Sequence, residues 1–143
     1  MPRLINEIIV HCSATEAGKN FHAADIRSWH MAKGWRDIGY HYVIDLDGTI
    51  EKGRRVSLAG AHCKGHNAHS IGICYIGGLQ DGKPADTRTP AQKAAMNNLI
   101  GNLTKMYGCR TLGHHDIQPY KQCPCFDAIK EYDGLWKRLK GLI

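Results

Sequence analysis

The sequence of 143 residues has no apolar run that approaches the length of a membrane-spanning helix, so no helical membrane insertion is expected. Residues 1–7 contain neither a long apolar core nor a small-residue cleavage site, which argues against a secretory signal peptide. We therefore expect synthesis in the cytoplasm. A protein that acts outside the cell would then need a holin or a secretion system for its release.

The chain also lacks internal repeats, low-complexity segments and linkers, so we expect one compact domain over residues 1–143. Its 43% hydrophobic and 22% charged residues are close to the average for a soluble globular domain, which argues against disorder. Without a secretion signal, the six cysteines are expected to be reduced. Cys123 and Cys125 have no distant partner pair, so a four-cysteine structural zinc site is not supported.

Basic residues outnumber acidic ones, which gives a net charge of +6 and a pI near 9.1. This charge suits an anionic partner such as nucleic acid, an acidic lipid surface or a cell-wall polymer, although it also fits an ordinary solubility charge. The lysines and arginines are scattered, whereas nucleic-acid-binding proteins more often concentrate them in a stripe. We therefore regard nucleic acid as an improbable partner.

Strand-like and helix-like patterns alternate along the chain. The predicted strands are 8–11, 40–45, 49–51, 70–76 and 110–113. The predicted helices are 25–33, 90–107 and about 126–139, with Gly134 as a candidate break in the last. This alternation predicts an α/β fold, with a mixed central β-sheet flanked by helices.

Two of the predicted helices have recognisable apolar faces. Ile26 and Trp29 are expected to supply the apolar face of the first helix. Residues 89–92 (Thr-Pro-Ala-Gln) match a capping box with proline at the first helical position. The residues of this second helix that we expect to face the core are Ala95, Leu99, Leu103 and Met106.

The segment 113–124 carries most of the chemical information, because it places His114, Lys121 and Cys123 on one short loop. His11 directly follows the apolar run 8–10, and sites in open α/β sheets gather at strand ends. Two histidines and one cysteine form a three-ligand zinc set with the fourth position open, as in catalytic sites. Singly, a strand-end histidine and a buried thiol are ordinary; together with Lys121 they point to zinc.

Some roles stay open at this level. His114 and His115 are adjacent and point to opposite sides of an extended segment, so only one of them faces a given metal. Asp116 either supports a ligand imidazole or forms a turn. A zinc ion in this set would lower the pKa of bound water and polarise a carbonyl. Lys121 would stabilise the developing oxyanion, and Tyr40 would orient or deprotonate the water.

A series of motifs, in order, resembles the zinc-dependent N-acetylmuramoyl-L-alanine amidases. These type-2 amidases share their fold with the peptidoglycan recognition proteins, and this chain is most similar to their amidase-type phage lysozymes. The motifs are 10–15 (VHCSAT), 38–44 (IGYHYVI), 47–48 (DG), 60–62 (GAH), 65–67 (GHN), 69–73 (HSIGI), 89–92 (TPAQ) and 113–124 (GHHDIQPYKQCP). They span nearly the whole chain.

The resemblance implies hydrolysis of the amide between the muramic-acid lactyl group and L-alanine of the stem peptide. The residues that it implies as Zn²⁺ ligands are His11, His114 and Cys123. Its Gly-His-x-Asp pattern favours His114 over His115. Tyr40 and Lys121 are implied as catalytic residues, whereas His62 and Asn67 would line the substrate groove or serve only as hydrogen-bonding loop residues.

The resemblance also implies alternatives to catalysis. Some members of the family that have lost a zinc ligand only bind peptidoglycan, and some phage relatives also inhibit an RNA polymerase, partly through an N-terminal extension. This chain keeps every ligand position and begins only a few residues before its first strand, so we expect an endolysin-like enzyme that acts on the anionic cell wall. A silent binding module or a polymerase regulator is the alternative. We expect a monomer, with RNA polymerase or an immunity protein as candidate protein partners.

Overall fold

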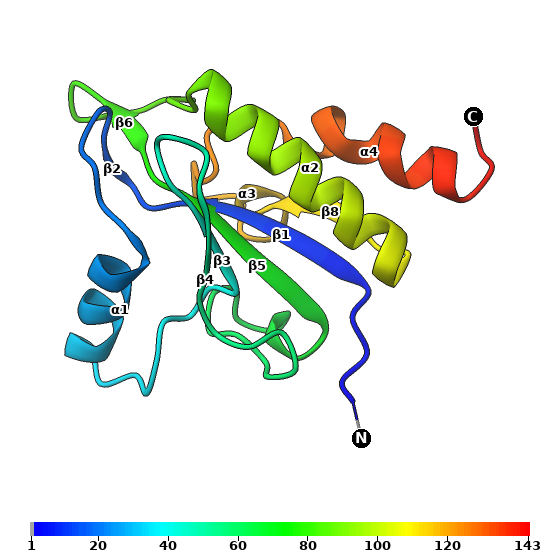
Figure 1. Ribbon diagram of the computed structural model, residues 1–143, viewed down its shortest axis with the longest axis horizontal. Coiled ribbons are helices and arrows are strands. Elements are labelled where there is room, and N and C mark those ends of the chain that lie inside the picture. Colours follow the sequence, from blue (N-terminus) through cyan, green and yellow to red (C-terminus); the bar gives the residue numbers. More distant parts are fainter. Residues whose placement is uncertain (1) are drawn as a thin grey trace.

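A five-stranded sheet with the order β4–β3–β5–β1–β8 organises the computed structural model, which describes residues 2–143 (Figure 1). Its strands are β1 (Glu7–Cys12), β3 (Tyr42–Ile44), β4 (Ile50–Lys52), β5 (Ser70–Tyr75) and β8 (Arg110–Gly113). The strands β3, β5, β1 and β8 are parallel, and β4 returns antiparallel to β3 as a hairpin. The predicted mixed α/β sheet is therefore confirmed.

A small second sheet was not predicted from the sequence. It has the order β2–β6–β7 and lies next to α1 at the left of Figure 1. Its strands are β2 (Thr15–Glu16), β6 (Gly78–Gln80) and β7 (Lys83–Pro84). Because β2 follows β1 and β6 follows β5, this sheet extends the carboxyl end of the main sheet.

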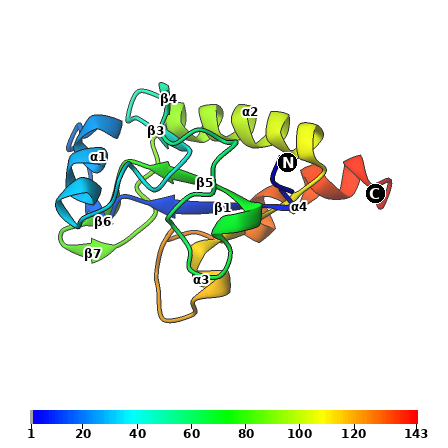
Figure 2. The ribbon, with the colours of Figure 1, turned by 90° about the horizontal axis from the view of Figure 1, so that it is seen from below.

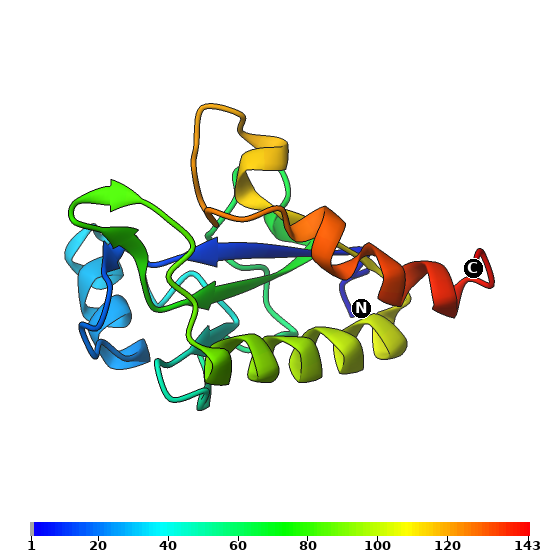
Figure 3. The ribbon, with the colours of Figure 1, turned by 90° about the horizontal axis from the view of Figure 1, so that it is seen from above.

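Helices cover both faces of the main sheet. They are α1 (Ala23–Ala32), α2 (Pro90–Tyr107), α3 (His114–Ile117) and α4 (Ala128–Leu139), with a 3₁₀ turn η1 (Asn67–His69) before β5. In Figures 2 and 3, α2 runs along one face of the sheet, and α3 with the loop that follows it stands on the other. Within residues 2–143, no helix is both long enough and apolar enough to cross a membrane.

The two central strands are buried on both faces, as their continuous apolar sequences predict. Ile8, Val10 and Ile73 pack with Met96 and Ile100 of α2 in the larger core cluster. Each fully buried side chain of this kind stabilises the fold by about 1.5–3 kcal/mol. This rigid pair, β1 and β5, is the frame to which the functional side chains are attached.

The capping box of α2 is confirmed. Thr89 Oγ1 accepts a hydrogen bond from the Gln92 amide at 3.0 Å, and Gln92 Oε1 accepts one from the Thr89 amide at 2.9 Å. The helix ends at Gly108, whose φ of 65° lies in the left-handed region that favours glycine.

The buried face of α2 matches the predicted stripe in part: Leu103 is buried, and Ala95 and Leu99 are half-buried and pack against the core. Met96, Ile100 and Leu103 face the core, but Met106 is 70% exposed. The Gln92 side chain is fully buried and donates to the carbonyl groups at the ends of two strands, at 3.2 and 3.0 Å. These bonds fix the rotation of the helix, which turns Met106 toward solvent.

Two further helix predictions need correction. Trp29 of α1 does not enter the core with Ile26; it is 39% exposed and packs edge-on against Phe21 with ring centroids 5.0 Å apart. The last helix, α4, continues through Gly134 without a break. A helical glycine costs only about 1 kcal/mol relative to alanine, which tertiary packing offsets.

Candidate active site

His11, His114 and Cys123 converge at the carboxyl end of β1. His11 lies on β1, and His114 is the first residue of α3, directly after β8. Val10 pairs with Gly113 in the parallel register of β1 and β8. The residues that follow them, His11 and His114, therefore lie side by side. One potential ligand atom from each of the three side chains lies within 4.8 Å of the other two.

Both imidazoles are held from behind by a polar partner. Gln118 Oε1 lies 2.6 Å from His114 Nε2 and accepts its proton, while His11 Nε2 lies 2.8 Å from His62 Nδ1. The Nδ1 atoms of His11 and His114 face each other at 3.2 Å. Two imidazole nitrogens and a sulfur at this spacing are a donor set that fits one metal ion.

Burial keeps these imidazoles neutral. It lowers the pKa of His11 well below its ordinary value, and the neighbouring His62 and His114 lower it further. Burial likewise lowers the pKa of His62 to about 3 and lowers the pKa of His114. Neutral imidazole is the protonation state that binds a metal ion.

The sulfur of Cys123 is placed by the loop after α3. The Cys12 backbone amide donates a hydrogen bond to Cys123 Sγ at 3.1 Å. The loop is fixed from both sides: the His115 amide donates to the Cys123 carbonyl group at 2.8 Å, and the buried Tyr75 hydroxyl donates to the Pro124 carbonyl group at 2.6 Å. These hydrogen bonds therefore fix the position of the Cys123 side chain without a disulfide.

The structure separates the two adjacent histidines. His114 lies beside His11, whereas the His115 ring lies on another side of the loop, 3.8 Å from a carboxylate oxygen of Asp116. Asp116 itself accepts the Gly113 amide at 2.7 Å and caps α3. Of the two roles considered for Asp116, the structure shows the turn-forming one, and Gln118 supports the imidazole instead.

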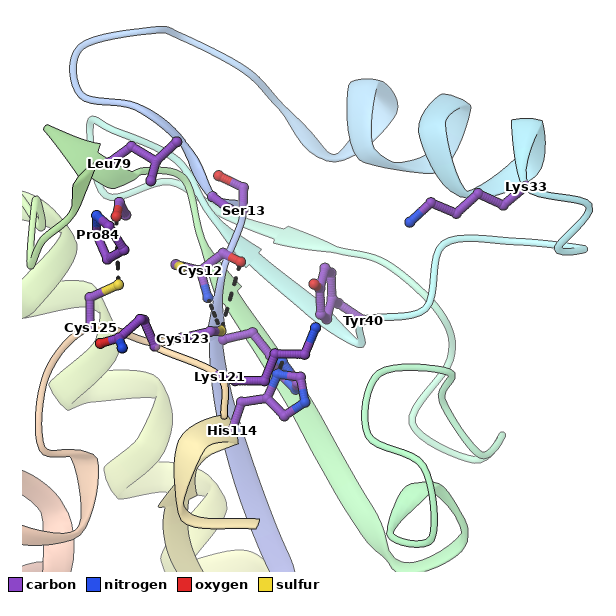
Figure 4. Close-up of a pocket in the computed structure, with 14 residues that line it drawn as sticks. Cys12, Ser13, Lys33, Tyr40, Leu79, Pro84, His114, Lys121, Cys123 and Cys125 are labelled. Carbon is purple, nitrogen blue, oxygen red and sulfur yellow. Dashed lines mark hydrogen bonds between the residues drawn. The ribbon is translucent and has the colours of Figure 1, made fainter. Parts of the chain in front are cut away.

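The candidate ligands border a cavity of about 400 Å³ that Tyr40 and Lys121 also line. Figure 4 shows Lys121 and Tyr40 on the same side of this pocket as His114. The rings of Tyr40 and His11 have centroids 5.1 Å apart. Burial, assisted by the nearby thiols of Cys74 and Cys123, raises the pKa of Tyr40 well above its ordinary value, so the phenol stays protonated.

His62 and Asn67 lie on the loop before β5 and line an adjoining hollow of about 380 Å³. Asn67 Oδ1 accepts hydrogen bonds from the amides of His62 and Cys63, both at 2.9 Å. Asn67 thus fixes the loop, and His62 contacts His11 directly. Both therefore have a structural role in addition to any contact with substrate.

Two residues of this site were not recognised from the sequence. Gln118 lies four positions after His114, a spacing that places both on one side of a helical turn and was available as a signal. Lys33, at the end of α1, lines the same cavities as Lys121. No sequence pattern connects Lys33 with residues 121–123, because only the fold brings them together.

Comparison with known proteins identifies this arrangement. A family model described as N-acetylmuramoyl-L-alanine amidase matches residues 1–126. The chain belongs to this amidase family. The amidase is 46% identical over 135 residues to the endolysin of Enterobacteria phage T3, covering 92% of this chain and 89% of that one. It is 45% identical over 128 residues to the endolysin of Escherichia phage T7, covering 88% and 84% of the two chains.

Solved structures agree with this assignment. The N-acetylmuramoyl-L-alanine amidase LysC from Clostridium intestinale URNW is 27% identical, with a TM-score of 0.78 over 97% of this chain and 87% of that one. Drosophila PGRP-LB is also 27% identical, with a TM-score of 0.74 over 90% and 79% of the two chains. The predicted family and its fold are therefore confirmed, and the amidase is a peptidoglycan hydrolase.

Proposed function

We propose that this amidase uses one zinc ion, held by His11, His114 and Cys123, to cleave the amide between N-acetylmuramic acid and L-alanine of the stem peptide. The observation that supports this most is the pair of facing Nδ1 atoms, 3.2 Å apart, with a sulfur beside them. Two neutral imidazoles and a thiolate are a familiar zinc donor set, and three protein ligands leave a position free.

A zinc ion held there would supply a water of lowered pKa and a Lewis acid for the scissile carbonyl. The chain's own residues then determine how the substrate lies. Lys121 borders the cavity next to His114, so its ammonium would stabilise negative charge that develops on the carbonyl oxygen. The protonated Tyr40 hydroxyl would orient the attacking water and assist proton transfer.

The loop that carries His62 and Asn67 would contact the peptidoglycan strand. It lines the hollow that adjoins the cavity, and Lys33 and Lys121 border both. Two ammonium groups at the entrance would attract an anionic wall polymer, in agreement with the net charge of +6. A release route from the cytoplasm, by a holin or a secretion system, is part of this proposal.

A catalytically silent binding module is the rival. A silent member of the family would lack a ligand, whereas here the three ligand atoms lie within 4.8 Å of one another. Nothing about residues 2–143 specifically favours binding to an RNA polymerase or to an immunity protein. We therefore retain the enzyme as the proposed function.

The test is digestion of purified peptidoglycan, with and without a chelator, followed by mass analysis of the released fragments. We expect stem peptides with a new N-terminal alanine, lost with the chelator and restored by zinc. Cys123→Ser should lower the rate roughly a thousandfold or more, since a bound metal contributes several kcal/mol to transition-state stabilisation. A zinc-loaded protein that binds the wall but releases no fragments would refute the proposal.

A further inference from the structure

A second group of metal-binding side chains lies at the other end of β1. Glu7 begins that strand, His66 directly precedes the 3₁₀ turn η1, and His69 is the last residue of that turn. One potential ligand atom from each of these residues lies within 4.8 Å of the other two. We propose that Glu7, His66 and His69 form a second zinc site, separate from the amidase centre.

The donor set fits this ion. Two imidazoles and one glutamate are a ligand combination found in zinc enzymes, and three protein ligands leave room for water. A single carboxylate oxygen, Glu7 Oε1, contacts both rings: His66 Nδ1 and, at 3.2 Å, His69 Nε2. The carboxylate side chain is 14% exposed and the imidazoles 32% and 36%, so the ion can reach them from solvent.

The backbone holds the three side chains in place. Side chains three residues apart stack on one side of a 3₁₀ turn, which places His66 above His69. The His69 amide donates to the His66 carbonyl group at 3.3 Å, and the Asn6 amide donates to the His69 carbonyl group at 2.9 Å. Glu7 pairs with Ser70, the first residue of β5. Glu7 and the turn that carries the two histidines are therefore both anchored to the main sheet.

The site is distinct from the amidase centre but mechanically linked to it. Glu7 and His11 lie four residues apart on β1, which corresponds to roughly 13 Å along a strand. The loop that carries His62 contacts the amidase centre, since His62 Nδ1 lies 2.8 Å from His11 Nε2. Asn67, between the two proposed ligands of η1, fixes the same loop through the His62 amide. Zinc at the second site would therefore stabilise the loop that supports His11.

The experiment isolates the second site by removing the first. Cys123→Ser is dialysed against zinc, and bound zinc is counted per chain, with binding measured by calorimetry. We expect one equivalent in this variant and two in the original chain. Adding His69→Ala should weaken the remaining binding more than the roughly 10- to 100-fold caused by loss of a supporting residue. Because the first site is absent, the result is independent of the proposed mechanism.

Two further variants control for folding. Glu7→Gln keeps the shape of the side chain but removes its charge, and it should also weaken binding. Lys64→Ala, an exposed change on the same loop, should leave binding unchanged. Zinc should raise the melting temperature of Cys123→Ser but not of Cys123→Ser/His69→Ala, since a ligand stabilises only the state that binds it.

Cobalt provides a spectroscopic check. A cobalt ion bound by Cys123 would show thiolate charge-transfer absorption, whereas one bound by Glu7, His66 and His69 would not, because this set has no sulfur. Absence of zinc binding by Cys123→Ser, or equal binding with and without His69, would overturn the second site.

Discussion

The two ends of β1 carry two clusters of similar composition but different construction. At the carboxyl end, Gln118 and His62 contact the Nε2 atoms of the two imidazoles, and the two Nδ1 atoms face each other at 3.2 Å. At the amino end, Glu7 accepts a hydrogen bond from His66 Nδ1, and its Oε1 atom lies 3.2 Å from His69 Nε2. The facing nitrogens of the first cluster are therefore paired only with each other, whereas the imidazoles of the second already have a carboxylate partner.

This difference predicts unequal affinity. At the carboxyl end His11 is buried, and Gln118 and His62 orient the two imidazoles before the ion arrives, so little has to be reorganised on binding. At the amino end, a metal must first displace the contacts between Glu7 and the two rings, and none of the three ligands is fully buried. We therefore expect the amidase centre to bind zinc more tightly, and only this centre to have a substrate cavity beside it.

Among the variants that test this difference between the two clusters, Lys121→Ala should have the largest effect. The ammonium borders the cavity but is not among the ligands, so zinc content should stay unchanged while kcat falls roughly 10²- to 10³-fold. Peptidoglycan turnover and metal content are measured on the same preparation. Lys93→Ala, which removes the same charge from an exposed position on α2, is the control and should keep full activity. Full activity of Lys121→Ala would show that the oxyanion role is wrong.

A smaller effect is expected from Gln118→Leu, which tests the support behind the His114 imidazole. Without the acceptor 2.6 Å from Nε2, the ring loses its fixed tautomer, and zinc affinity should fall about 10- to 100-fold. Competition with a chromophoric chelator measures this zinc affinity. The variants are made in a His69→Ala background, so that only the amidase centre binds zinc. Gln118→Glu keeps an acceptor and should bind zinc at least as tightly as the parent. Equal affinities for the leucine and glutamate variants would contradict the proposed support.

Much of this arrangement follows from local sequence. The continuous apolar runs of β1 and β5 predict strands buried on both faces, and the loop 113–124 concentrates His114, Lys121 and Cys123 within ten residues. The capping box at Thr89 likewise depends only on residues three apart. Such features are predictable because the interacting groups are neighbours in the chain.

What could not be predicted depends on contacts between distant segments. The rotation of α2, which exposes Met106, is set by hydrogen bonds from Gln92 to strand-end carbonyl groups. The contact between His62 and His11 joins residues 51 positions apart, and the Glu7–His66 contact joins residues 59 apart. Nine histidines give too many possible pairings for sequence spacing to select these ones.

A third cluster, at Asp45, extends the comparison to a site where neighbours compensate poorly for a buried charge. Asp45 is 3% exposed, and its Oδ1 atom has no hydrogen-bond partner among residues 2–143. Its Oδ2 atom lies 3.1 Å from His22 Nδ1, and Glu51 approaches the same ring at 4.0 Å. Burial and the Glu51 carboxylate raise the pKa of Asp45 from 3.8 to about 6.

The smallest predicted effect is therefore a pH-dependent gain in stability from Asp45→Asn. A raised carboxyl pKa means that the native state binds the proton more tightly than the unfolded state, so stability falls as the pH rises from 3.8 to about 6. His22, whose pKa is raised mainly by Asp45, loses its contribution as the pH rises further. Asp45→Asn removes both effects and should raise the melting temperature at pH 8 by roughly 3–6 °C, with less gain at pH 5.

The matched control for this prediction is Asp47→Asn in the adjacent turn. The Thr49 amide donates to the Asp47 carboxylate at 2.9 Å and lowers the pKa of that group, so its charge is favourable in the native state above its ordinary pKa. Neutralising Asp47 should therefore give no gain at pH 8. Thermal unfolding at both pH values separates the two carboxylates, because both are ionised at pH 8 but only Asp47 stays ionised at pH 5. A pH-independent change for Asp45→Asn would mean that packing, rather than the buried charge, limits stability there.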